Sequence, residues 1–205
     1  MTRAATRSRL PLASFVFFVI AMGTTPAEAH LNSTGMGPIY DGMMHFLMSP
    51  EDIIPVLALA LLAGLRGPSH GRRTLLVLPV AWFIGGLFGS MATASTGSAV
   101  LSAASFLLFG SLLAADAKLP LPATTVLAAL LGLYHGFRNG IGMGPLSLTS
   151  VALLGLVFAV FVLVALSAAF VVQMRAQWAR TAVRVAGSWV AACGLLMLGW
   201  AFHNR

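Results

Sequence analysis

Long apolar runs alternate with short gaps of glycine, proline and charged residues along most of the chain. After residue 49, these runs predict six helices, near residues 50–66, 74–92, 98–115, 121–138, 148–172 and 182–202. Most of them approach the roughly 20 residues that an α-helix needs to cross a bilayer. The first run is shorter, and Ser49 and Pro50 suit its N-cap and first helical position. The pattern predicts an all-α, polytopic membrane protein, in which residues 30–205 form a single membrane domain with about six transmembrane helices.

The first 29 residues have a different organisation. Three arginines precede an apolar stretch over residues 10–23, and an Ala-Glu-Ala sequence ends at residue 29. A basic head, a short apolar stretch and an A-x-A site are typical of a secretory signal peptide. We therefore predict that residues 1–29 are a cleaved signal peptide and that the mature chain begins at His30. An uncleaved first helix is the alternative.

The composition excludes the main soluble classes of protein. Hydrophobic residues make up 59% of the chain and charged residues only 8%, whereas soluble domains carry about 25% charged residues. The 12 Lys and Arg against 5 Asp and Glu do not indicate a nucleic-acid partner, because the basic residues lie in short gaps between apolar runs.

The distribution of basic residues over these gaps predicts the orientation in the membrane. An excess of Lys and Arg marks the cytoplasmic side. The predicted inner loops contain Arg66, Arg72, Arg73, Lys118, Arg175, Arg180 and Arg184, and the outer side keeps Arg138 and Arg205. We therefore expect a bacterial inner-membrane protein with both termini in the periplasm.

Glycines at four-residue spacing occur twice. Gly85 and Gly89 form one pair, and a second run extends from Gly132 to Gly144. This spacing places small residues on one ridge of a helix and allows another backbone to approach, within the chain or in a second copy. The second run is followed by Pro145, and it predicts a helix end that passes into a re-entrant or cavity-lining loop.

Metal-binding residue types concentrate in the segment before the first run. Asp41 and His45 are four residues apart, so on a short helix that starts at Pro38 they share one face. A carboxylate beside an imidazole can bind a first-row divalent metal, or the carboxylate can orient the imidazole. A surface ion pair is the alternative. The break before Pro50 can also bring Asp52 or Glu51 toward His45, unless both are ordinary helix-start charges.

Further candidates lie at the mature N-terminus and in a later run. At the predicted N-terminus, His30 would offer both an α-amine and an imidazole to a metal ion. His135 shares a helix face with Asn139 in the glycine-rich run, although it can instead bond a backbone carbonyl. Four methionines lie between residues 36 and 48, and thioethers either suit Cu(I) or pack as flexible apolar groups. An intramembrane hydrolase using Ser147 and His135 lacks a G-x-S-x-G setting, so we predict no enzyme.

Two segments resemble a known family. Residues 40–67 read YDGMMHFLMSPEDIIPVLALALLAGLRG after the predicted signal peptide, and residues 131–136 read LGLYHG. This layout is similar to the HupE/UreJ family of small bacterial inner-membrane proteins with about six spans. The resemblance implies a nickel or cobalt permease linked to hydrogenase or urease maturation, with Asp41, His45 and His135 interacting with the metal. The adjacent Asp-His pair of the better-known branch is absent here, which implies a divergent branch.

Together these observations predict a secondary transporter for a divalent transition-metal ion. Nickel is the expected cargo, with cobalt or copper as alternatives, and no cofactor is expected to be bound permanently. The predicted metal-binding residues are His30, Asp41, His45, Asp52 and His135. The expected partners are the metal ion, the lipid bilayer and a second copy of the chain. A non-transporting, periplasm-facing metal-binding accessory protein and a copper-related membrane protein remain as alternatives.

Overall fold

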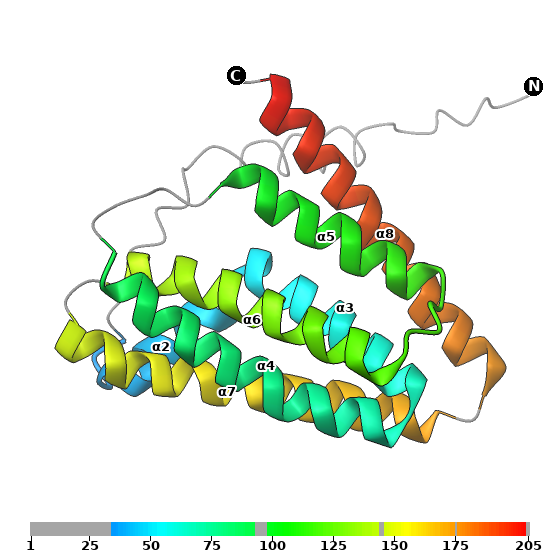
Figure 1. The fold of residues 1–205 in the computed structure, drawn as a ribbon, viewed down its shortest axis with the longest axis horizontal. Helices are drawn as coiled ribbons and strands as arrows, with labels where there is room; N and C mark the ends of the chain where they lie inside the picture. Colours follow the sequence, from blue (N-terminus) through cyan, green and yellow to red (C-terminus); the bar gives the residue numbers. More distant parts are fainter. Residues whose placement is uncertain (1–33, 93–97, 144–145, 175, 204–205) are drawn as a thin grey trace, which may run out of the picture.

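The computed structural model describes residues 34–92, 98–143, 146–174 and 176–203, so the predicted signal peptide and His30 lie outside the described residues. Within these ranges all the regular structure is helical (Figure 1). The helices are α2 (Pro38–Leu47), α3 (Pro50–Arg66), α4 (Pro68–Ser90), α5 (Ala99–Ala114), α6 (Leu121–Gly142), α7 (Leu146–Gln173) and α8 (Gln177–His203). Each of the six predicted runs coincides with one of α3 to α8, and α2 starts at Pro38 as expected. The all-α prediction is confirmed.

Several of these helices can cross a membrane by length and composition. Three qualify individually: α4, α8 and the Ser150–Gln173 part of α7. The pair α2 and α3, bent by 73° at their junction, qualifies if it forms a single broken span, and α5 is a shorter apolar helix. α6 is 22 residues long but contains His135, Arg138 and Asn139. The protein is polytopic, while the count of six spans stays a prediction.

Helix α3 lies in the centre of the bundle. It contacts α4, α5 and α7, and its middle residues Val56, Leu59 and Leu62 have no exposed surface. A helix that is apolar on all sides gains most when neighbours surround it. The short run that begins at Pro50 is therefore a core helix enclosed by the others (Figure 1).

Glycines form a close seam between α4 and α6. The seam consists of Gly85 and Gly89 on α4 and Gly132, Gly136 and Gly140 on α6, each facing a backbone carbonyl of the other helix. A Cβ at Gly136 would lie 2.1 Å from the Trp82 carbonyl oxygen. α6 continues through most of the glycine run and ends at Gly142, so the helix end predicted for this run is found, and the loop predicted after it stays a prediction. Gly144 and Pro145 lie outside the described residues.

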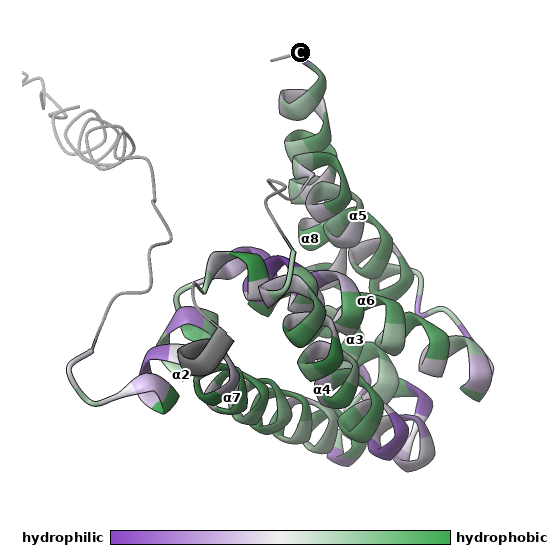
Figure 2. Ribbon diagram, turned by 60° about the vertical axis from the view of Figure 1, so that its left-hand side comes forward, coloured by the Kyte–Doolittle hydropathy of each residue, from purple (hydrophilic) through white to green (hydrophobic). Residues whose placement is uncertain are grey.

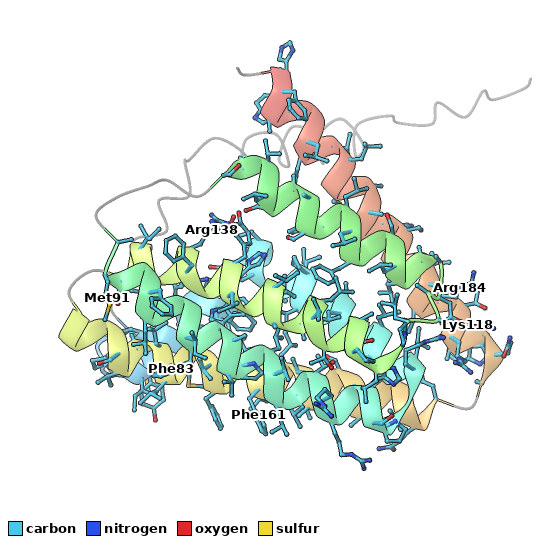
Figure 3. The ribbon with its side chains drawn as sticks, viewed as in Figure 1. Phe83, Met91, Lys118, Arg138, Phe161 and Arg184 are labelled. Carbon is cyan, nitrogen blue, oxygen red and sulfur yellow. The ribbon has the colours of Figure 1, made fainter. Side chains whose placement is uncertain are left out.

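The surface of the bundle is apolar along the helices and polar near their ends (Figure 2). Lys118 and Arg184 lie at one end, and Met91 and Arg138 lie toward the other (Figure 3). The end with Lys118 holds the last turn of α3, the first turn of α4, the α5–α6 connection and the start of α8. Six of the seven predicted inner basic residues therefore gather at one end, called here the basic end; Arg175 is outside the described residues. Which side of the membrane this end faces stays a prediction.

Candidate functional site

A buried carboxylate and a buried imidazole meet between α3 and α6. Asp52 lies in the first turn of α3, directly after the Pro50 start, and His135 lies in the second half of α6. The Asp52 Oδ1 atom is 2.7 Å from His135 Nδ1, and the two side chains are 4% and 0% exposed. Because a buried charge or polar group is costly without a partner, this contact indicates a specific pairing of the two helices.

Two further polar side chains complete this arrangement. Asn139, one turn after His135, donates from Nδ2 to Asp52 Oδ2 at 2.9 Å and to the His135 carbonyl oxygen at 2.8 Å. Ser105 of α5 lies 3.3 Å from His135 Nε2 and donates its own hydroxyl to the Ser102 carbonyl. We call Asp52, Ser105, His135 and Asn139 the buried polar cluster. It connects three helices, and both carboxylate oxygens and both ring nitrogens have partners.

Aromatic rings enclose the imidazole. The Trp82 ring centre lies 5.6 Å from that of His135, and the Tyr134 ring meets it edge-on at 5.0 Å. Trp82 is fully buried, and its indole N–H has no partner among the described residues. Such surroundings exclude water and strengthen the hydrogen bonds within the cluster.

An ion pair lies beside the buried polar cluster and closer to the surface. Arg138 donates to the Glu51 oxygens at 3.1 and 3.3 Å and to the Ser102 hydroxyl at 2.6 Å. Glu51 and Arg138 are sequence neighbours of Asp52 and Asn139, so α3 and α6 are bridged twice. The Arg138 and Glu51 side chains are 22% and 43% exposed. The Arg138–Glu51 ion pair thus lies between the buried polar cluster and the surface, and its two charges neutralise each other.

The other predicted site residues lie elsewhere. Asp41 and His45 share α2 as expected, but Asp41 accepts hydrogen bonds from the Thr34 amide and hydroxyl at 2.6 and 2.7 Å. The His45 ring has no hydrogen bond or ion pair with another described residue. No group of three or more His, Cys, Asp or Glu side chains comes together within the described part of the chain. The four described members of the predicted set therefore do not form one centre.

The expectation that the break before Pro50 brings Asp52 or Glu51 toward His45 is wrong. The 73° bend directs Asp52 into the core, where His135 and Asn139 hold it, and Glu51 pairs with Arg138. Ser49 occupies the N-cap position, but its hydroxyl donates back to the His45 carbonyl. The backbone alternative for His135 is also wrong, because its ring nitrogens contact side chains.

Sequence reasoning missed Ser105 and treated Glu51 as a helix-start charge. Nothing near Ser105 in the sequence distinguishes it from the other small residues of α5. The shared face of His135 and Asn139 was a usable signal, and the structure confirms it. Of the four methionines, Met36 and Met48 are well exposed, whereas Met43 packs against the core. The side chain of Ser147 is outside the described part of the structure.

Comparison with known proteins places the chain in a family. Searches of curated proteins and of solved structures gave no significant match. A family model described as HupE / UreJ protein matches residues 18–197, which is more than half of the chain. The chain is therefore a multi-pass membrane protein of the HupE/UreJ family.

Proposed function

We propose that this protein is a secondary transporter that carries a divalent transition-metal ion, nickel in the first place, into the bacterial cytoplasm for urease or hydrogenase maturation. The family is associated with nickel or cobalt uptake for these enzymes. The observation that carries the proposal is the buried Asp52–His135 pair inside a helical membrane bundle. Ionisable groups at such positions are costly and mark ion pathways.

The geometry supports separate roles for the two side chains. Asp52 bonds Nδ1 at 2.7 Å, whereas Ser105 lies at the longer distance of 3.3 Å from Nε2. The weaker contact is the easier one to displace, so Nε2 is the nitrogen that we assign to the metal. Asp52 then orients the ring from the other side, as carboxylates do for metal-binding histidines. Imidazole nitrogen is a suitable donor for nickel and copper.

A small number of donors fits transport better than storage. The buried polar cluster offers one imidazole, one carboxylate and the side-chain oxygens of Ser105 and Asn139, and no third His, Cys, Asp or Glu joins it among the described residues. An ion in transit must be released again, so tight enclosure by many protein ligands is unfavourable. His45 on α2, with Asp41, and His30 at the mature N-terminus are the residues that we assign to capture on the outer side.

The membrane potential can drive this movement. Two positive charges moving inward gain about 4.6 kcal/mol per 100 mV. In the proposed orientation the basic end faces the cytoplasm and both termini face the periplasm, so the ion enters past Glu51 and Arg138.

The test is ⁶³Ni²⁺ uptake into liposomes that contain purified protein, with a membrane potential imposed. His135→Gln and Asp52→Asn are compared with wild type and with His203→Gln, which changes an exposed histidine at the end of α8. We expect each cluster variant to lower uptake about 10-fold or more, and the control to retain it. Competition by Co²⁺ and Cu⁺ ranks the alternative ions.

Two results would overturn the proposal. Unchanged uptake in both cluster variants would reject the site. Saturable Ni²⁺ binding by wild-type protein with no flux would favour the metal-binding accessory protein.

A further inference from the structure

A polar cavity of about 340 Å³ lies at the basic end of the bundle. It is formed where α3 ends, where α5 connects to α6 and where α8 begins. Its charged lining residues are Arg66, Asp116, Lys118, Arg180 and Arg184. Four cationic side chains against one carboxylate leave the lining with a net charge of +3. The buried polar cluster contributes no residue to this cavity.

The three arginines of the cavity are held in place, and among the described residues only Arg66 has an acidic partner. Arg66 pairs with Asp116, and its buried Nε atom has no partner among the described residues. Arg184 donates from Nε to the Ala114 carbonyl at 3.1 Å, and Arg180 donates to the Leu65 carbonyl at 3.4 Å. Each guanidinium has five N–H donors, so most remain available.

Lys118 adds a cation with no fixed partner. It has no hydrogen bond or ion pair with another described residue, although it lines the same cavity. The neutral side chains of Gln177 and Thr181 line the cavity as well; the Gln177 amide supplies further donors, whereas the Thr181 hydroxyl donates to the Gln177 carbonyl. The cavity therefore holds several oriented N–H groups that face too few acceptors.

We propose that this cavity binds a phosphate group. Phosphate oxygens match the forked geometry of arginine, and their charge offsets the surplus of the lining. Two sources share this chemistry: the head group of an anionic phospholipid, and free phosphate. Basic pockets between transmembrane helices are known to hold lipid head groups. Trp178, which is 77% exposed at the start of α8, lies next to the cavity residue Gln177 and suits the membrane interface.

The test measures binding to purified protein in nanodiscs. Native mass spectrometry compares retention of phosphatidylglycerol with that of phosphatidylcholine, and a separate titration with inorganic phosphate follows thermal stability. The cavity variant is Arg180→Gln/Arg184→Gln. The matched control is Arg72→Gln/Arg73→Gln, which removes the same charge from exposed positions of α4 outside this cavity.

We expect the cavity variant to bind the preferred ligand about tenfold more weakly than wild type, and the control to bind as wild type. Preference for phosphatidylglycerol identifies the lipid as the source, and stabilisation by inorganic phosphate alone identifies the free ion. Because Arg180 and Arg184 also contact backbone carbonyls, Lys118→Gln serves as a second variant without such contacts, and it should weaken binding in the same direction. Two results would overturn the proposal: equal loss in the cavity and control pairs, or a wild-type protein that neither prefers phosphatidylglycerol nor is stabilised by inorganic phosphate. None of these measurements depends on nickel transport, so their outcome is independent of the proposed function.

Discussion

The Asp52 carboxylate can stay buried because each of its oxygens has a hydrogen-bonding partner. His135 Nδ1 contacts Oδ1, and Asn139 donates to Oδ2. Asn139 also donates to the carbonyl of His135, one turn earlier in α6, so the amide is anchored to the helix that carries the imidazole. The position of the carboxylate thus depends on a residue that we do not assign to the metal.

Asn139→Ala should destabilise the protein by about 1–3 kcal/mol, because it leaves Asp52 Oδ2 buried without a donor. The same substitution should cost less in an Asp52→Asn background, where no charge is left unpaired. Reversible unfolding in detergent, run as a double-mutant cycle, measures the difference. Equal costs in the two backgrounds would show that Asn139 does not stabilise the carboxylate.

At the scale of helices, the α4–α6 seam determines how closely the imidazole approaches its aromatic neighbours. Gly136 follows His135 directly, and the backbone it touches is that of Trp82, whose ring lies beside the imidazole. By contrast, the backbones of α3 and α6 come close at few positions. Polar side chains therefore connect α3 to α6, whereas backbone contact connects α4 to α6.

Gly136→Ala should destabilise the protein by about 1–3 kcal/mol, because its Cβ would lie 2.1 Å from the Trp82 carbonyl oxygen. Gly142→Ala, in the last turn of the same helix, meets nothing within 4 Å and should change stability by no more than about 1 kcal/mol. Thermal unfolding of the two variants in the same detergent provides the comparison. A similar effect of both substitutions would contradict the close seam.

At the scale of the whole molecule, charge is distributed along the long direction of the bundle. The basic end carries the cavity, while Arg138 at the other end is neutralised by Glu51. The basic residues that the positive-inside rule assigns to separate inner loops lie together at the basic end. We therefore expect this end to face the cytoplasm.

Single cysteines can test the orientation. Cys193 is the only cysteine in the sequence, so Cys193→Ser provides the background. With a membrane-impermeant maleimide, we expect Met36→Cys to be labelled in intact spheroplasts and Arg73→Cys only after the spheroplasts are permeabilised. Both positions are exposed, so access depends on the membrane. The opposite labelling pattern would place the basic end in the periplasm.

The pattern of residues along the chain is enough to predict the helices and the distribution of charge. An apolar run must satisfy its backbone hydrogen bonds within the segment when it lies in lipid, so composition and length suffice to predict a helix. The start of α2 at Pro38, the start of α3 at Pro50 and the shared face of His135 and Asn139 follow from such local rules. The glycine spacing predicted close packing, although it did not identify α4 and α6 as the partners.

The tertiary structure alone decided which polar residues meet. Asp52 and His135 are 83 residues apart, and the helical period says which face of each helix is polar but not which helix lies opposite. Asp52 pairs with His135 and not with His45, its neighbour in the sequence, because the bend after α2 directs the start of α3 into the bundle. There, a buried carboxylate is stable only beside the donors that α6 supplies.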